Sequence, residues 1–426
     1  MNAAPSGTTT AGSDEAPVAV KLSRGRMVFA VSIVWLLYFL DFVARFGVNP
    51  LYPLIQKDLA LTDAQVGMLG SVVLAGMAIL VLPLSYLADR WSRSKLLSIM
   101  AFVWSACSVI SGWTHGFGVL VAARFGLGVG EASFAPTATA LLTSWFPRAA
   151  WGRVLGLFNT AVSLGIFIGS VLSGYLGATI GWRATLIAVG LPGIILGLLA
   201  LWIPDAKRVR NRGGVADANA PPTVRDAAAV VLKNRSMVML IVFYGIINMG
   251  IVTVLTWSPM YYVRVMEFPV QTAATLAGVA AVLGVLGFPL GGLLSDYLVK
   301  RDLRYRMWLP AIAALGVAVL LAIGFGSHSV AFILTGCFVS TFINPSLNAA
   351  TQELAPERYR SVAMGVVIFG MQAVGMAGPW IAGIISMRFG LATALVAFQA
   401  SFVVAAIGLA LAAVSYRANC AAVEAG

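Results

Sequence analysis

The sequence predicts an all-α membrane protein whose twelve transmembrane helices form two six-helix bundles related by pseudo-two-fold symmetry. Three observations predict this fold class: the composition, a series of twelve apolar runs, and the distribution of lysine and arginine. Of the 426 residues, 60% are apolar and only 10% are charged, and the mean hydropathy is +0.91. Soluble domains carry roughly a quarter charged residues. So few charges could not cover the surface of a water-soluble protein of this length, and we therefore expect the lipid bilayer as its partner.

The apolar runs are separated by short polar breaks. Each is long enough to cross a hydrocarbon core of about 30 Å, which takes roughly 20 helical residues. In chain order the predicted spans are Met27–Asn49, Ala64–Ala88, Leu96–Trp113, Phe117–Trp145, Val154–Ile180, Ala184–Ile203, Met237–Val263, Val270–Leu298, Met307–Phe325, Ser329–Glu353, Val362–Met387 and Leu391–Tyr416.

Lysine and arginine alternate between the connecting segments. With the N-terminus inside the cell, the inner segments hold 22 of these residues and the outer segments hold 4. This asymmetry follows the positive-inside rule. It predicts a multi-pass protein of the cell inner (plasma) membrane with both termini cytoplasmic. It also accounts for the net charge of +12 without nucleic acid as a partner.

The chain divides into two halves that resemble each other. We expect a disordered cytoplasmic tail over 1–26, six-helix bundles over 27–203 and 236–416, a basic cytoplasmic linker over 204–235, and a second tail over 417–426. Asp89 and Asp296 follow the second and eighth spans, 207 residues apart, while Pro147 and Pro356 are 209 apart. Convergence on short basic loops is the alternative to an internal repeat. A repeat of this kind would place a substrate site between the halves, near the membrane midplane.

Four ionisable residues lie deep inside predicted spans: Asp41, Arg45, Arg124 and Glu131. Each costs about 2.5–3.5 kcal/mol at a helix centre, so such residues face the protein interior and normally have partners. At about 1.5 Å per residue, Asp41 and Arg124 fall at nearly the same depth, which predicts that they pair. Glu131 lies roughly 10 Å further toward the cytoplasm, and no arginine is expected at its level.

These four side chains are candidates for coupling protons to an anion. A buried carboxyl group can exchange protons near neutral pH, so Asp41 and Glu131 are the candidate proton sites, in an order left open. Protonation would free Arg45 and Arg124 to bind a substrate carboxylate. The alternatives are a fixed salt bridge for Asp41, a permanently paired carboxylate for Glu131, and an outer-gate charge for Arg45.

The second half carries polar, uncharged side chains in its seventh and tenth spans. Asn344, Asn348 and Gln352 share one helix face, which suits the hydroxyl groups of a polar ligand. Asn248 and Trp257, with Tyr38 of the first span, complete the candidate substrate-binding set. Hydrogen bonding between helices, or packing for the aromatic residues, is the alternative reading for each of these side chains.

No motif predicts an enzyme, a cofactor or a metal site. Cys107, Cys337 and Cys420 are scattered, and His115 and His328 lie in outer loops away from other candidate catalytic groups. No soluble stretch is long enough for a nucleotide-binding domain. We therefore expect a monomer that acts on a small molecule without a cofactor.

Two motifs resemble those of a known family. The loop Ser85–Lys95 (SYLADRWSRSK) is similar to the signature loop of the major facilitator superfamily, with serines in place of both glycines and of the middle basic residue. The segment from Arg124 through Glu131 to Pro136 is similar to the anion:cation symporter and Spinster-like branches. Those branches usually have Asp-Arg adjacent in the first span, whereas here Phe42 follows Asp41.

The resemblance implies a function and a mechanism. It implies alternating access by rocking of the halves, with the first, fourth, seventh and tenth helices lining the cavity. It also implies a cytoplasmic gate, for which the candidate residues are Asp89, Arg90, Arg93 and Asp296; a simple topogenic loop is the alternative. We expect a proton-coupled symporter of a small organic anion, a carboxylate. The alternatives are a Spinster-like transporter of lysolipids or other amphiphiles and a proton-coupled exporter.

Overall fold

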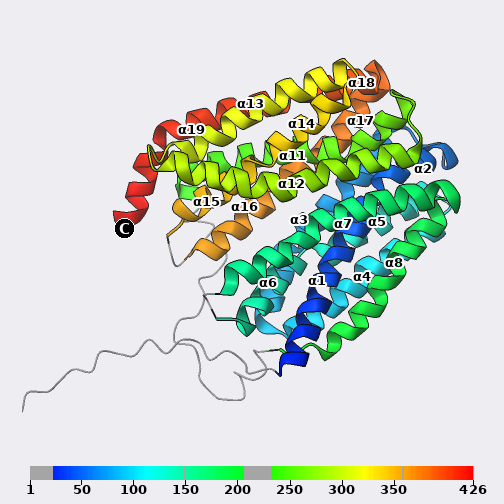
Figure 1. Ribbon diagram of the computed structural model, residues 1–426, viewed down its shortest axis with the longest axis horizontal. Coiled ribbons are helices and arrows are strands. Elements are labelled where there is room, and N and C mark those ends of the chain that lie inside the picture. The colour runs from blue at the N-terminus through cyan, green and yellow to red at the C-terminus, as the bar shows by residue number, and fades with distance from the viewer. Residues whose placement is uncertain (1–22, 148–149, 206–231, 357–358, 426) are drawn as a thin grey trace, which may run out of the picture.

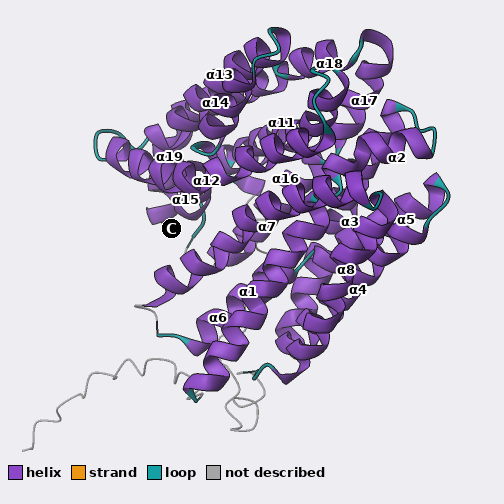
Figure 2. Cartoon of the chain, turned by 45° about the vertical axis from the view of Figure 1, so that its right-hand side comes forward, coloured by secondary structure: helices purple, strands orange, loops and turns teal. Residues whose placement is uncertain are grey.

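The computed structural model describes residues 23–147, 150–205, 232–356 and 359–425. Most of the predicted N-terminal tail and linker therefore lies outside the described residues. In the described part all regular structure is helical, and the helices are joined by short loops (Figure 2). Twelve helical segments are long and apolar enough to cross a membrane, which confirms the predicted number of spans.

The first bundle contains the first six spans. Its helices are α1 (Arg24–Phe46), η1 (Asn49–Leu51), α2 (Tyr52–Asp58), α3 (Asp63–Arg90), α4 (Arg93–Trp113), α5 (Phe117–Glu131), α6 (Phe134–Trp145), α7 (Trp151–Thr179), α8 (Trp182–Leu199) and η3 (Ala200–Trp202). Polar caps begin several of them. The Thr62 hydroxyl accepts a hydrogen bond from the backbone N–H of Gln65, and the Gln65 side chain accepts one from the backbone N–H of Thr62, so a capping box begins α3.

The second bundle contains the other six spans. Its helices are α11 (Arg235–Arg264), α12 (Val270–Val299), α13 (Tyr305–Gly326), α14 (Val330–Ser340), α15 (Ile343–Glu353), α16 (Arg360–Gly375), α17 (Ala377–Phe389), α18 (Leu391–Phe398) and α19 (Ala400–Ala425). Figure 1 shows the two bundles side by side, with α7 lying along α12.

The fourth and tenth spans are each broken near their centres. Pro136 is the third residue of α6 and Pro345 is the third residue of α15, 209 residues further on. Proline lacks an N–H group, and its ring excludes the carbonyl four residues earlier, so each span is interrupted just before these positions. The matching breaks extend the internal repeat from sequence to structure. They place Glu131 at the last residue of α5, directly at the break.

The bundles meet at one end, which we call the closed end. There α3 packs against α17 so tightly that a Cβ atom at Gly67 would collide with the backbone carbonyl of Pro379. Near the opposite end, where α3 ends at Arg90, Cβ atoms added at Gly152, Gly156 or Gly365 would meet no neighbouring atom within 4 Å. We call this the basic end. The bundles therefore contact each other at the closed end and separate toward the basic end (Figure 1).

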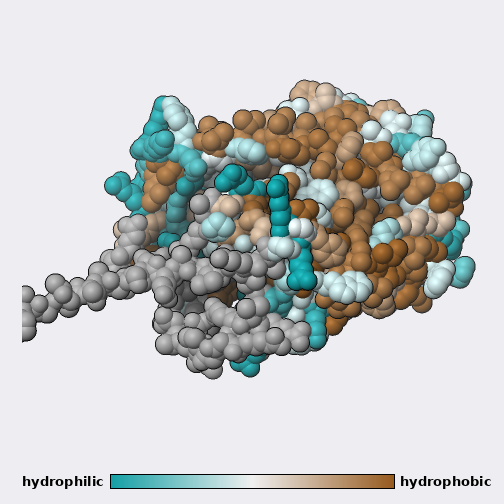
Figure 3. All heavy atoms as spheres, turned by 60° about the horizontal axis from the view of Figure 1, so that its bottom comes forward, coloured by the Kyte–Doolittle hydropathy of each residue, from teal (hydrophilic) through white to brown (hydrophobic). Residues whose placement is uncertain are grey.

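The outer surface matches a lipid environment. Large apolar side chains are exposed along most spans, including Leu286 at 65% and Ile407 at 57%. Figure 3 shows hydrophobic atoms over most of the right-hand half of this view, and hydrophilic atoms at the left, near the centre and along the right-hand edge.

Candidate functional site

A cluster of four charged side chains lies inside the first bundle, where α1 meets α5. Arg45 is in the last turn of α1, and its Nε donates a hydrogen bond of 2.6 Å to Oε2 of Glu131. Its Nη2 lies 3.4 Å from Oδ2 of Asp41, one turn earlier on the same helix. The Asp41 and Glu131 side chains are 2% and 0% exposed, whereas Arg45 is 14% exposed. One guanidinium group therefore serves two buried carboxyl groups.

Arg124 has a different role in the cluster. Its Nη2 donates to the backbone carbonyl of Arg45 at 3.1 Å, and its Nη1 donates to that of Ala44 at 3.5 Å. These carbonyls belong to the last turn of α1, which has no intrahelical donors for them and carries the negative end of the helix dipole. Arg124 thus caps α1 and fixes the position of Arg45.

The predicted Asp41–Arg124 pair is therefore wrong, as is the expectation that no arginine reaches Glu131. Counting the helical rise gives the depth of a Cα atom but not the direction of its side chain. Side chains on a helix tilt toward its N-terminus, and an arginine is long enough to cover a full turn. Arg45 thus reaches back into the bundle to the level of Glu131.

Several polar atoms of the cluster have no partner. Among the described residues, Oδ1 of Asp41, Oε1 of Glu131, Nε of Arg124 and the hydroxyl of Tyr52 are buried without a hydrogen bond. Buried polar groups are normally satisfied, and exceptions are frequent at functional sites. Free capacity on both carboxyl groups leaves room for a proton. Tyr52, which is fully buried on α2 beside Arg124, is a member of the site that the sequence analysis missed.

Aromatic rings surround the charges. The guanidinium carbon of Arg45 lies 4.9 Å from the centre of the Phe42 ring and 5.9 Å from that of Phe46. Tyr38, a predicted substrate contact, stacks on Phe158 at 4.2 Å between ring centres and is buried. Tyr38 thus packs α1 against α7 in this conformation.

Most of the predicted polar contacts of the second bundle bond to the protein itself. Asn248 donates to the backbone carbonyl of Met371 and to Gln372, and the Trp257 indole donates to the carbonyl of Pro379. The hydroxyl of Tyr244 donates to Oδ1 of Asn348.

Gln352 and Asn344, two other members of the predicted set, are placed differently. The backbone carbonyl of Gln352 accepts a hydrogen bond from Arg360, while Asn344 lines a cavity between the bundles. The structure thus brings together the four charged residues but distributes the uncharged ones along α11 and α15.

The candidate gate residues lie at the basic end. Arg93 donates from Nη1 to the carbonyl of Ala140 at 3.0 Å, and its backbone N–H donates to Asp205. Asp296 pairs with Arg306 of its own bundle at 2.8 Å. Arg90 ends α3, and the side chain of Asp89 lies outside the described residues. Gating by these residues stays a prediction.

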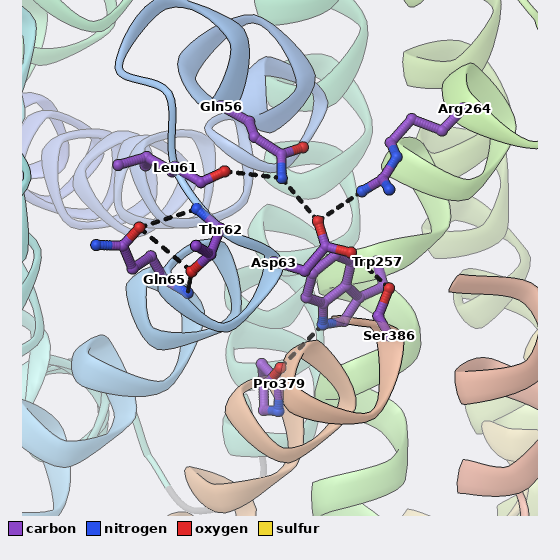
Figure 4. Close-up of polar contacts among 9 residues, drawn as sticks. All are labelled: Gln56, Leu61, Thr62, Asp63, Gln65, Trp257, Arg264, Pro379 and Ser386. Carbon is purple, nitrogen blue, oxygen red and sulfur yellow. Dashed lines mark hydrogen bonds and ion pairs between the residues drawn. The ribbon is translucent and has the colours of Figure 1, made fainter. Parts of the chain in front are cut away.

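The closed end holds a polar network that the sequence analysis did not predict. Oδ1 of Asp63 accepts hydrogen bonds from Gln56 and from Arg264, both at 2.7 Å, and Oδ2 accepts one from Ser386 at 2.6 Å. Figure 4 shows how this carboxylate, at the start of α3, joins the ends of α11 and α17 in the other bundle. We call Asp63, Arg264 and Ser386 the latch.

Twelve spans in two bundles, with charges buried between helices, define a membrane transport protein. The chain belongs to the Major Facilitator Superfamily, whose family model matches residues 34–379.

Among curated relatives, it is 27% identical to the "Probable sulfoacetate transporter SauU" of Cupriavidus necator, over 84% of this chain and 87% of the relative. It is 26% identical to the "Probable galactarate/D-glucarate transporter GudP" of Bacillus subtilis, over 67% and 69%. To protein spinster of Drosophila melanogaster it is 26% identical, over 68% and 49%.

Solved structures share the fold. A bacterial homolog of the human lysosomal transporter Spinster, in an inward-facing and unoccupied conformation, aligns with a TM-score of 0.77 at 19% identity, covering 94% of this chain and 98% of that one. A D-xylose-proton symporter aligns with a TM-score of 0.71 at 16% identity, covering 91% and 97%.

Proposed function

We propose that the protein is a proton-coupled symporter of a small organic anion that works by alternating access. The observation that carries this proposal is the sharing of the Arg45 guanidinium between the buried carboxyl groups of Glu131 and Asp41. Relatives whose names specify sulfoacetate and galactarate or glucarate transport support an anion as substrate.

The charge balance of the cluster explains the coupling. Two carboxylates and two guanidinium groups sum to zero when all are ionised. An added anion leaves a net negative charge in a region of low dielectric, where an uncompensated charge is costly. A proton on one carboxyl group restores neutrality and at the same time removes one of the two carboxylate partners of Arg45. Proton and monovalent anion therefore bind together, in a ratio of one to one.

Glu131 is the better candidate for the proton. Asp41 and Arg45 lie four residues apart on one helix, so their separation changes little when helices move. Glu131 reaches Arg45 from a different helix, at the break between α5 and α6, and its contact is the shorter one. This contact can open when the proton binds. Asp41 then remains as the permanent partner that keeps Arg45 in place.

The conformation fits one step of the transport cycle. The positive-inside rule orients the basic end toward the cytoplasm and the closed end outward. The latch then seals the outer side while the bundles separate toward the cytoplasm. Rocking of the bundles opens the latch and closes the cytoplasmic gate formed by Asp89, Arg90, Arg93 and Asp296. The protein acts as a monomer in the plasma membrane, without enzymatic activity.

Proteoliposomes test the proposal. A panel of labelled anions (sulfoacetate, glucarate and hexanoate) is offered at equal pH and with an acidic exterior. We expect accumulation of at least one anion with the acidic exterior to exceed that in protein-free liposomes, which uncharged hexanoic acid enters by itself. This excess should be abolished by a protonophore and unchanged by a potassium-diffusion potential. Arg45→Ala should abolish uptake, whereas Arg183→Ala, which removes a surface pair with Asp58, should not. Transport insensitive to pH would refute proton coupling.

A further inference from the structure

A cavity between the bundles is mostly apolar, although the predicted ligand contacts are polar. It contains about 730 Å³ of empty space, part of it open to solvent, and lies among α7, α11, α12, α13, α19 and the broken tenth span. Its walls include Ile166, Val254, Phe288 and Leu321. No charged side chain lies in its described lining. The lining of a ligand site sets which chemistry the site accepts.

A second, smaller cavity adjoins this one. The smaller cavity, of about 390 Å³, is lined by Phe46, whose ring faces the Arg45 guanidinium. The two cavities share the lining residues Ile166, Val254, Leu255, Ala280 and Cys337. The apolar space therefore begins beside an aromatic ring that lies near the guanidinium group to which we assign the substrate anion.

Few polar groups in the cavity are free to bind hydroxyl groups. The hydroxyl protons of Ser340 and Thr341 are donated to backbone carbonyls of their own helix, at 2.7 Å and 2.6 Å. In the part of the chain that the structure describes, only Ser163 and Asn344 of the polar lining residues lack a hydrogen-bond partner. A sugar acid would bury several hydroxyl groups against carbon here, which is costly without partners.

We propose that the substrate is an amphipathic monocarboxylate: an anionic group joined to a compact apolar body, of the size of an aromatic ring or a short alkyl chain. This inference rests on the proposed function, since Arg45 supplies the charge recognition. The apolar body fills the cavity, and Ser163 and Asn344 accommodate at most one or two polar substituents. The chain thus differs in ligand chemistry from relatives named for polyhydroxylated acids.

A chain-length series tests the proposal. Binding of butyrate, pentanoate, hexanoate and octanoate to the purified full-length protein in nanodiscs is measured by calorimetry, beside glucarate and lysophosphatidic acid. Each buried methylene should tighten binding roughly fourfold until the cavity is filled. Glucarate should bind at least about 100-fold more weakly than hexanoate.

Two variants on α12 separate cavity binding from partition into lipid. Ala280→Leu adds bulk where both cavities meet, whereas Val285→Leu adds one methylene on an exposed face of the same helix. Ala280→Leu should reduce the affinity for hexanoate about tenfold or more and leave butyrate less affected, and Val285→Leu should change neither. Unchanged melting temperatures would show that both variants fold.

The outcomes distinguish the two proposals. The proposal of an amphipathic substrate is overturned if glucarate binds more tightly than hexanoate, or if affinity does not change along the chain-length series. The symporter proposal survives that result if glucarate binding is still accompanied by proton uptake. Tighter binding of lysophosphatidic acid than of every short acid also overturns it, in favour of a lipid-like substrate. A steep series without proton uptake supports the amphipathic substrate and overturns the symporter.

Discussion

Replacement of Glu131 by glutamine tests the coupling most specifically, because it removes the charge and preserves the shape. The side-chain amide can still accept the 2.6 Å hydrogen bond from Arg45. What is lost is the charge of a carboxylate that competes with the substrate for the guanidinium group. In the native protein this competition strengthens as the pH rises and Glu131 ionises, so the anion should bind less tightly at alkaline pH.

The magnitude follows from the kind of hydrogen bond. A bond to a charged group contributes about 1.5–3 kcal/mol and a neutral one about 0.5–1.5 kcal/mol. The difference, about 1–2 kcal/mol, corresponds to roughly 5- to 30-fold in affinity. Glu131→Gln should therefore bind the anion roughly 5- to 30-fold more tightly than the native protein at alkaline pH, with little dependence on pH.

Transport assays should show the complementary effect. Exchange of labelled for unlabelled anion needs no net proton movement and should persist in Glu131→Gln, whereas accumulation driven by a pH gradient should be lost. Glu353→Gln is the matched control because Glu353 also pairs with an arginine, Arg306 at 2.8 Å, outside the cluster. It can change the rate but should keep the coupling. Full pH-driven accumulation by Glu131→Gln would refute the reasoning.

Three further predictions concern the arginine fork and the closed end. Arg45→Lys keeps the charge but loses the planar fork, so calorimetry should show anion binding weakened by about 1–2 kcal/mol; unchanged affinity would argue against bidentate binding. Asp63→Asn weakens the latch by about 1–3 kcal/mol. Ser71 of α3 accepts a hydrogen bond from the backbone N–H of Trp380 on α17, so a cysteine introduced there should then react faster with an external impermeant maleimide, against the baseline of the native cysteines. Gly67→Val places a side chain against the Pro379 carbonyl, so the protein should insert normally yet fail to close outside and fail to transport; normal uptake would contradict the packing at the closed end.

The fold could be predicted from the sequence because each helix that crosses the bilayer needs about 20 mostly apolar residues. Apolar runs of sufficient length, together with the alternation of basic loops, predicted twelve spans and two halves, and the structure has both. Hydropathy could not show where a span breaks. The fourth and tenth spans read as continuous, and only the positions of Pro136 and Pro345 mark the interruptions that the structure reveals.

The residues of the charged cluster could be predicted from the sequence, but the contacts among them could not. Charge inside an apolar run is a strong signal, so Asp41, Arg45, Arg124 and Glu131 could be found. Their partners depend on side-chain direction, which residue spacing along two separate helices does not specify. Asn248 and Trp257 bond across helices rather than into a cavity, a choice that a helical face cannot indicate.

The latch escaped prediction for a different reason. Asp63 and Arg264 lie at the ends of their spans, where charged residues are ordinary features of membrane helices. They are 201 residues apart, and only the packing of the bundles brings them together.

Proton uptake on anion binding tests the central claim most directly. Calorimetric titration of the purified protein with hexanoate, and in parallel with glucarate, in two buffers of different ionisation enthalpy gives the number of protons bound per anion. The account predicts about one proton per hexanoate at mildly alkaline pH, and none in Glu131→Gln; glucarate, which carries two negative charges, would bind with two protons. Binding of either anion by the native protein with no proton uptake at any pH would contradict it.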